Sequence, residues 1–376
     1  MLFKNILVPL DGSALAERAI PHAIAVARLL DSNIVLLRVL DTETQSTAPS
    51  DPLRWQIRRA DAELHLREIE AGICASLGEP APEPEAARDD AGVPASSAAG
   101  LAAATLPQSA PLVPGAGVAT TVSEAATEGE PECGRPRRVR RLLLEGRTAE
   151  TIVDACAAED IDLLVLSTHG AGGLSRWSLS SVTQKVLNLA YLPVLIVRSY
   201  RVPDAEMAEV HYKRILVPLD GSRRAESALS AAEALAHAQE AELVLLSVIR
   251  PPELPDGGPF LGEFKEILDR LMTEVRRAYG AYLQEVSDRL PVASEWHLVE
   301  ENSIISALED ACRDRNIDLV VLCAHGQAAR GVQPYGAVAR YAIEDGTWPL
   351  LILQDIRRVD TRPTAAEQAA DSTRSR

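Results

Sequence analysis

The chain has 376 residues, enough for two or three domains, and its 47% hydrophobic and 24% charged residues are typical of soluble globular proteins. The formal net charge of −16 argues against broad nucleic-acid binding, which needs a basic surface that displaces phosphate counterions. The sequence contains no signal-peptide pattern and no run of roughly 18–20 apolar residues, so we expect no membrane partner. The five cysteines form no CxxC pair, which predicts thiols in a reducing compartment and a cytoplasmic protein.

Two segments recur along the chain, which indicates an internal duplication. The run ILVPLDGS follows Asn5 and again follows Arg214, 209 positions later. The segment DLLVLSTHG begins at Asp162 and recurs as DLVVLCAHG at Asp318, only 156 positions later. The difference of 53 residues places a net insertion inside the first copy.

The predicted insertion covers residues 78–136, which are rich in Ala, Pro, Gly, Ser and acid and contain no aromatic residue. Such a segment cannot bury enough apolar surface to offset the entropy lost on ordering, so we expect a disordered acidic loop. The same reasoning predicts a disordered tail over 358–376. The chain then divides into a first domain over 1–200, a linker over 201–212 and a second domain over 213–357.

In the first copy, short apolar runs alternate with helical patterns. The turn and cap residues Asp11-Gly12-Ser13 precede a helix whose one face carries Ile20, Ala23, Ile24 and Ala27. Further helices are predicted over 53–77, 148–159 and 181–190. The predicted strands cover 6–10, 34–40, 138–144, 163–167 and 194–197.

The second copy repeats this order, with predicted strands over 215–219, 243–249, 295–299, 319–323 and 350–353. Strict β/α alternation predicts an α/β fold, here two tandem doubly wound domains, each with a five-stranded parallel sheet. In such sheets a ligand binds beyond the carboxyl ends of the strands, where the winding reverses.

Two features of each copy fall at that edge of the sheet. Asp11 and Asp220 directly follow the first strands, and a loop follows each fourth strand. The loops read Ser167-Thr168-His169-Gly170, nine residues, Ser180-Ser181-Val182, and Cys323-Ala324-His325-Gly326, nine residues, Gly336-Ala337-Val338. Each loop leads into a helix N-terminus, whose amides and dipole attract anions, and glycine permits close approach of the backbone. Glycine loops alone are a weak signal of phosphate binding.

Together, these segments resemble the universal stress protein family, whose members carry G-x-x-G, nine residues and G-[S/T] after the fourth strand. The resemblance covers both copies, roughly residues 1–200 and 211–356. It implies a Rossmann-like domain of the adenine nucleotide alpha hydrolase type with strand order 3-2-1-4-5. It also implies ATP or ADP as ligand, with Mg²⁺ only as the companion of a bound nucleotide, although some members of the family bind no nucleotide.

The resemblance also implies which residues would contact a ligand. In the first copy they are Pro9, Asp11, Val39, Ser167, His169, Gly170, Gly173, Ser180, Ser181 and Val182. In the second copy they are Pro218, Asp220, Val248, Cys323, His325, Gly326, Gly336, Ala337 and Val338. Ser167, Cys323 and Ser180 replace glycines of the family pattern, and Ala337 replaces its hydroxyl residue.

Family members dimerise through their last strands, so the resemblance implies that 194–197 and 350–353 pair within the chain as a pseudo-dimer; a homodimer is a further expectation.

The leading functional hypothesis is a nucleotide-binding protein of stress response or regulation. A scaffold that binds other proteins and no nucleotide is the alternative. An ATP-hydrolysing enzyme ranks last because no general base is apparent, so no catalytic residue is assigned. His169 and His325 lack partners at metal-ligand spacing, and no metal site is predicted.

Overall fold

The computed structural model describes residues 3–41, 52–79, 138–168, 179–198, 210–252, 261–326 and 333–354. Nearly all of the predicted insertion, most of the predicted linker and the predicted tail lie outside these described residues. The disorder predicted for the insertion and the tail, and the domain boundaries, stay predictions.

The first repeat contains β1 (Asn5–Leu10), α1 (Ala14–Glu17), α2 (Ala19–Leu30), β2 (Asn33–Asp41), α3 (Pro52–Leu77), β3 (Val139–Gly146), α4 (Thr148–Ala158), β4 (Leu163–Ser167), α5 (Ser181–Leu189) and β5 (Val194–Val197). The second repeat contains β6 (Arg214–Pro218), α6 (Arg223–Gln239), β7 (Glu242–Ile249), α7 (Leu261–Arg289), β8 (Ser294–Glu300), α8 (Ile304–Asp314), β9 (Leu319–Cys323), α9 (Ala337–Glu344) and β10 (Leu350–Leu353). The predicted strands are therefore present in both repeats, with ends that differ by at most two residues.

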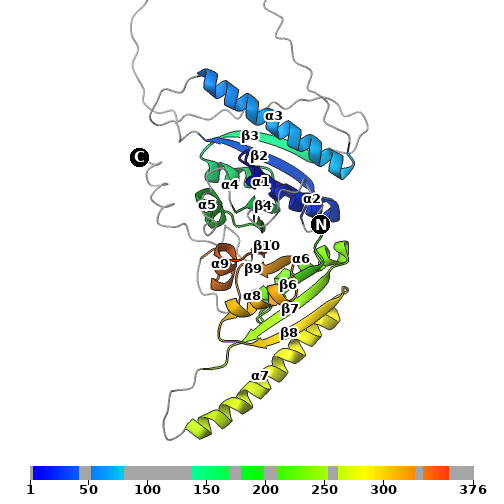
Figure 1. Cartoon of the computed structure of the whole chain (residues 1–376), viewed down its shortest axis with the longest axis vertical. Helices are drawn as coiled ribbons and strands as arrows, with labels where there is room; N and C mark the ends of the chain where they lie inside the picture. The colour runs from blue at the N-terminus through cyan, green and yellow to red at the C-terminus, as the bar shows by residue number, and fades with distance from the viewer. Residues whose placement is uncertain are drawn as a thin grey trace, which may run out of the picture. The chain divides into compact units, whose positions relative to one another are not determined.

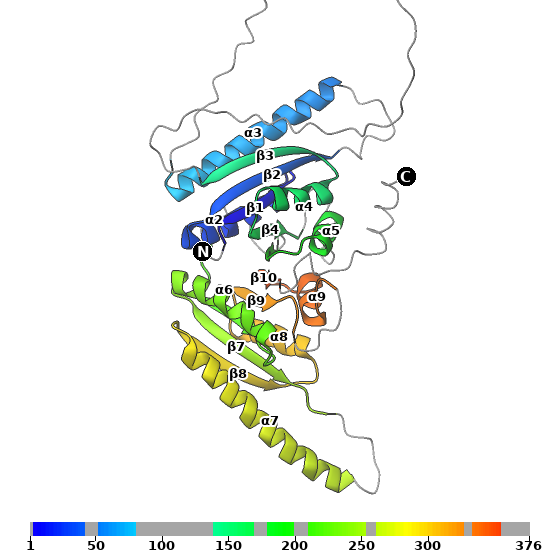
Figure 2. The same cartoon turned by 180° about the vertical axis from the view of Figure 1, so that it is seen from behind.

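The ten strands form one sheet in the order β3-β2-β1-β4-β5-β10-β9-β6-β7-β8. Within each repeat the neighbouring strands are parallel, and each repeat has the predicted order 3-2-1-4-5. The α/β fold with two doubly wound repeats is confirmed. Figure 1 shows α3 beside β3 and α7 beside β8, and Figure 2 shows the same helices from behind.

Side chains that alternate along the strands build two cores, one on each face of the sheet. Ile6 and Val8 of β1 join the core formed with α2, α3, α6 and α7. Leu7, which points to the opposite face, joins the core formed with α4, α5, α8 and α9. Both faces of the strands are covered by helices, which explains why the strands read as continuous apolar runs.

The ILVPLDGS run forms the same strand and turn in both repeats. Gly12 and Gly221 have φ of 81° and 80°, a left-handed conformation that glycine adopts at little cost. The serine that follows each glycine caps the next helix, because its side chain accepts the amide of Ala16 or Ala225.

One local difference separates the two copies after this turn. The first repeat breaks its helix at Arg18, between α1 and α2, whereas α6 is continuous. Pro21 lies in the first turn of α2, and its counterpart in α6 is Ser230. A proline has no amide hydrogen to donate to a carbonyl one turn earlier, which explains the break.

The last strands of the two repeats pair with each other. β5 and β10 are antiparallel, with Leu195 opposite Leu351. This is the intrachain pairing expected from the sequence. Each of the two strands would be an edge strand in its own repeat, and the pairing covers both edges. The expected homodimer stays a prediction.

Arg198 strengthens this junction from the end of β5. Its side chain is buried, and its guanidinium donates hydrogen bonds to the carbonyl oxygens of Ala342 and Ile343, the latter at 2.9 Å. These carbonyls lie in the last turn of α9, where a cation is favoured by the helix dipole. A side chain of the first repeat therefore holds the C-terminus of a helix of the second.

We expect Arg198→Ala to lower the free energy of unfolding by about 2 kcal/mol, because charge-assisted bonds to buried carbonyls are lost. Arg313→Ala is a matched control, since that side chain is 69% exposed and pairs with Asp310 within its own helix. Urea unfolding followed by circular dichroism would measure both changes. Equal stabilities of the two variants would show that the Arg198 contacts do not stabilise the junction.

A second contact between the repeats involves a buried histidine. His22 of α2 and Tyr212, which precedes β6, share a hydrogen bond of 2.6 Å between the imidazole Nδ1 and the phenol oxygen. Burial lowers the pKa of His22 to about 4. The imidazole is therefore neutral at pH 7. Its hydrogen bond to Tyr212 holds the segment before β6 against α2 of the first repeat.

Burial also accounts for two of the cysteines. Cys156 and Cys312, on the corresponding helices α4 and α8, both belong to the core, and burial raises the pKa of each thiol to about 12. They are unreactive core residues rather than nucleophiles. Among the helices in the described part of the chain, none is long and apolar enough to span a membrane.

Candidate functional site

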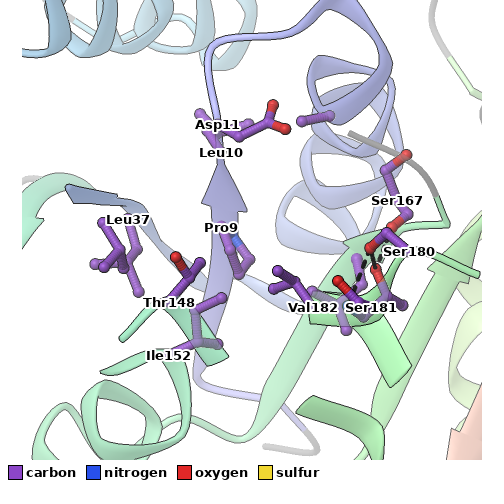
Figure 3. A pocket seen from close by; sticks show the side chains of 14 residues that line it. Pro9, Leu10, Asp11, Leu37, Thr148, Ile152, Ser167, Ser180, Ser181 and Val182 are labelled. Carbon is purple, nitrogen blue, oxygen red and sulfur yellow. Dashed lines mark hydrogen bonds between the residues drawn. The ribbon is translucent and has the colours of Figure 1, made fainter. Parts of the chain in front are cut away.

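A pocket of about 240 Å³ lies at the carboxyl ends of β1 and β4, where the strand order of the first repeat reverses. Figure 3 shows Asp11 beyond the end of β1, with Thr148 and Ile152 on one side and Ser180 and Val182 on the other. The lining thus combines one carboxylate, apolar strand residues and the N-terminal residues of two helices. This is the place where open α/β sheets bind ligands.

The carboxylate of Asp11 is oriented by the turn that follows it. Its Oδ1 accepts the amide of Ser13 at 2.9 Å and the Ser13 hydroxyl at 2.6 Å. Two donors on one oxygen fix the side chain so that its second oxygen has a defined position at the pocket.

The N-terminus of α5 is capped by side chains. The Ser180 Oγ accepts a hydrogen bond from the amide of Thr183 at 3.1 Å and lies 2.8 Å from the Thr183 Oγ1 (Figure 3). The Thr183 hydroxyl in turn donates a hydrogen bond to the carbonyl of Ser167 at 3.2 Å. Because a carbonyl only accepts, the Thr183 proton goes to Ser167 and the Ser180 hydroxyl donates to Thr183. The Ser180 proton is therefore used inside the protein.

The second repeat has a corresponding pocket of about 360 Å³ at the ends of β6 and β9. This volume lies within the range of small-molecule sites. The Asp220 Oδ1 accepts the amide of Ser222 at 3.0 Å, which repeats the arrangement at Asp11. The two pockets are therefore built on the same turn.

In the second pocket the loop after β9 lies against this carboxylate. A Cβ atom added to Gly326 would lie 2.3 Å from the Asp220 Oδ2, so only glycine fits between loop and strand end. His325 is 4% exposed, and its Nε2 donates to the carbonyl of Gln333 at 2.7 Å. This hydrogen bond therefore connects the residue near the start of the loop with a residue near its end.

The N-terminus of α9 differs from that of α5. The N-cap residue is Gly336, which has no side chain that could accept a hydrogen bond from the first turn of this helix. Ala337 and Val338, the first two residues of α9, line the second pocket, and amides at the start of a helix have no partner within the helix. An anion at this point would take the place of a capping side chain.

The described residues that the resemblance assigned to a site all line one of the two pockets. In the first pocket these are Pro9, Asp11, Val39, Ser167, Ser180, Ser181 and Val182. In the second they are Pro218, Asp220, Val248, Cys323, His325, Gly326, Gly336, Ala337 and Val338. His169, Gly170 and Gly173 lie outside the described residues.

Sequence reasoning missed other lining residues. Thr148 and Ile152 come from α4, and Ile304 begins α8, the helices that follow the third strands. Arg250, directly after β7, also lines the second pocket. The carboxyl ends of all strands in a parallel sheet meet at one edge. Residues that directly follow the second and third strands could therefore have been identified from the sequence as further candidates.

The comparisons with known proteins agree with this architecture. The sequence profile described as "Universal stress protein family" matches residues 2–198 and 211–354. A universal stress protein of Methanocaldococcus jannaschii is 24% identical over 197 residues, which are 52% of this chain and 83% of that protein. One from Mycolicibacterium smegmatis is 26% identical over 55% of this chain and 65% of its own length. One from Thermus aquaticus is 47% identical, over only 15% of this chain and 42% of its own length.

Solved structures show the same fold over nearly the whole chain. The universal stress protein of Archaeoglobus fulgidus aligns with 93% of this chain and 98% of its own, with a TM-score of 0.54 and 16% identity. A functionally unknown protein of Pseudomonas aeruginosa aligns with 93% of this chain and 92% of its own, with a TM-score of 0.54 and 14% identity. The chain therefore belongs to the universal stress protein family, of which it contains two domains in tandem.

Proposed function

We propose that the two pockets bind adenine nucleotides, ATP or ADP, and that the chain acts as a nucleotide-responsive protein of stress response or regulation. The observation that carries the proposal is the duplicated pocket at the strand-order reversal, which combines an oriented aspartate with a helix N-terminus in each repeat. Membership of the universal stress protein family supports the same ligand class.

Each part of a nucleotide has a suitable counterpart in the pockets. The second oxygens of Asp11 and Asp220 would accept hydroxyl protons of the ribose. The apolar side chains of Leu37, Val39, Leu246 and Val248 would pack against the base. The helix N-termini of α5 and α9 would face the phosphates, and Mg²⁺ would be held by the phosphates themselves.

Isothermal titration with MgATP would test this proposal on the full chain. Asp11→Asn and Asp220→Asn retain the oxygen that accepts the serine amide but place an amide donor at the second oxygen. We expect each substitution to lower the MgATP affinity of its own pocket about thirtyfold, which corresponds to about 2 kcal/mol. One of the two binding sites would then no longer be detected in the titration. Asp154→Ala, at an exposed position of α4, is the matched control and should bind as the wild type does.

Two outcomes would contradict the proposal. If the wild type shows no binding tighter than about 1 mM, a protein-binding scaffold becomes the better hypothesis. If both asparagine variants bind MgATP as the wild type does, the nucleotide lies elsewhere and the pockets have another ligand.

A further inference from the structure

The turn that carries Asp11 is contacted by an arginine on the side away from the first pocket. Leu37 and Val39 of β2 line that pocket, and Arg38, which lies between them, points to the opposite face of the sheet. A Cβ atom added to Gly12 would lie 2.8 Å from both Nη1 and Nη2 of Arg38. The guanidinium therefore occupies the space beside the Gly12 backbone, one residue after the carboxylate at the pocket.

Two further side chains hold this guanidinium in place. The Arg38 Nη1 lies 3.3 Å from the Nδ1 of His65 in α3, and the Nε2 of His65 lies 2.9 Å from the Oε1 of Glu17 in α1. Because a guanidinium can only donate, Nδ1 accepts the bond from Arg38, and Nε2 donates to the carboxylate. Each imidazole nitrogen thus has one defined partner.

These contacts return to the turn from which they start. Ser13 donates its amide and its hydroxyl to Asp11, and it also caps α1, the helix that carries Glu17. From Glu17 the contacts lead through the imidazole and the guanidinium back to Gly12. The turn is therefore held by α1, β2 and α3 together. A site whose polar atoms must stay within about 0.5 Å of one geometry depends on such supporting contacts.

In the second repeat a serine takes the place of this arginine. The register of β6 and β7 matches that of β1 and β2 with a shift of 209 positions, so Ser247 corresponds to Arg38. The Ser247 hydroxyl donates to the carbonyl that precedes Asp220 at 2.7 Å, and the Tyr279 hydroxyl donates to the carbonyl of Asp220 at 3.4 Å. The nearest atoms to a Cβ added to Gly221 belong to Tyr279, 4.0 Å away. Hydroxyl groups thus support the second turn and leave space beside its glycine.

We propose that Arg38 is a positioning residue of the first pocket, oriented by His65 and Glu17, and that it fixes the Asp11 turn in the conformation that binds nucleotide. This inference rests on the proposed function. Arg38 is not among the described residues that line the pocket, so it acts on the ligand through the turn. It governs the affinity of the first pocket and leaves that of the second unchanged.

The first test removes the guanidinium and measures each pocket alone in the full chain. Asp220→Asn leaves the first pocket to be titrated with MgATP, and Asp11→Asn leaves the second. We expect Arg38→Met to weaken the first pocket about tenfold and the second less than about twofold. Arg38→Lys, which keeps the charge but not the planar group beside the glycine, should weaken the first pocket about threefold. Arg140→Met is the matched control, since Arg140 is a strand arginine that pairs with Glu159, and it should leave both affinities unchanged.

A double-mutant cycle tests whether His65 acts through Arg38. His65→Gln keeps one acceptor and one donor and should weaken the first pocket less than about twofold, whereas His65→Leu removes both and should weaken it about fivefold. In the Arg38→Met background, His65→Leu should weaken it no further. Urea unfolding of the same variants shows whether stability changes together with affinity.

The two turn glycines provide a matched pair for the contact itself. Gly12 and Gly221 have φ of 81° and 80°, so alanine brings the same backbone strain to both turns. At Gly12 the added Cβ must also displace the guanidinium of Arg38. We expect Gly12→Ala to weaken the first pocket about fivefold more than Gly221→Ala weakens the second. In the Arg38→Met background the two alanine substitutions should have equal effects.

The outcomes separate this inference from the proposal beneath it. If the wild type does not bind MgATP, the proposed function is wrong and the inference falls with it. If MgATP binds, but Arg38→Met weakens both pockets equally or lowers only the stability, nucleotide binding stands and the positioning role of Arg38 is wrong. Additive effects of Arg38→Met and His65→Leu would show that the histidine does not act through the arginine.

Discussion

Replacing Gly326 by alanine is expected to weaken MgATP binding in the second pocket about thirtyfold or more, with little loss of stability. The added Cβ would lie 2.3 Å from the Asp220 Oδ2, a distance that Cβ atoms do not adopt, and 3.3 Å from its Cγ, which is a tight contact. The Asp220 side chain is short and its other oxygen holds the Ser222 amide, so it cannot rotate away without losing that bond. Either the carboxylate or the loop must move, and the pocket loses the geometry that the ligand needs.

Two other glycines provide graded controls for this effect. At Gly336 the nearest atom to an added Cβ is the Ala324 carbonyl oxygen at 3.3 Å, a tight contact that a small shift relieves. At Gly280 of α7 the nearest atom is the Trp296 Cη2 at 3.8 Å, an ordinary contact. Gly280→Ala should leave binding unchanged and stabilise the helix by about 0.5–1 kcal/mol.

Titration in the Asp11→Asn background would rank the three alanine variants, and urea unfolding would report their stabilities. We expect the affinity to decrease in the order Gly280→Ala, Gly336→Ala, Gly326→Ala. Wild-type affinity in Gly326→Ala would mean that the contact between loop and Asp220 has no part in the site.

The elements that could be predicted from sequence are those whose signal is local. The strands are short apolar runs because both faces of the sheet are covered. The turns at Gly12 and Gly221 are recognisable because each glycine, which adopts a left-handed conformation, lies between an aspartate and a capping serine. The duplication carries these signals twice, so each copy supports the interpretation of the other. Strand order came from the family resemblance rather than from any local pattern.

The contacts between the repeats could not be predicted in this way. Arg198 follows a strand whose sequence reads like any buried strand, and its partners lie 144 and 145 positions away. His22 and Tyr212 are 190 positions apart and belong to different repeats. The antiparallel pairing of β5 with β10 and the packing of α2 on α6 bring the two repeats together, so the roles of these residues depend on tertiary packing.

The candidate site shows the same division. The strand-end aspartates and the loops were identifiable because turn residues and glycines mark them in the sequence. Arg250 was not, because a charged residue after a strand has an ordinary explanation as a solvated surface residue. Its position became visible only in the structure, where it lines the second pocket together with Pro218 and Val248.

Acid is expected to weaken the junction between the repeats through His22. Burial holds the pKa of His22 at about 4, below its usual value of 6.5, so the folded state binds fewer protons than the unfolded state between these two values. The stability contributed by the neutral imidazole is complete above pH 6.5, decreases as the pH falls towards 4, and changes little further below that. The total loss is about 3 kcal/mol, since each pKa unit corresponds to about 1.4 kcal/mol.

The partner of His22 does not titrate in this range. Burial raises the pKa of Tyr212, and the negative charge of Asp318 raises it further, so the phenol stays protonated. Many carboxyl groups titrate between pH 4 and 5, so the wild-type curve alone does not isolate the histidine. The difference between the wild type and His22→Asn does, because the asparagine oxygen replaces Nδ1 as a hydrogen-bond partner but does not titrate.

Unfolding free energies measured in urea at intervals from pH 4 to pH 8 would provide this difference. The wild type should lose about 3 kcal/mol more than His22→Asn between pH 6.5 and 4. His237→Asn, at an exposed position in the last turn of α6, should follow the wild-type curve. Parallel curves for wild type and His22→Asn would refute a buried neutral His22. A difference of the expected size would mean that acidification acts on the contact between α2 and Tyr212, and so loosens the second repeat from the first.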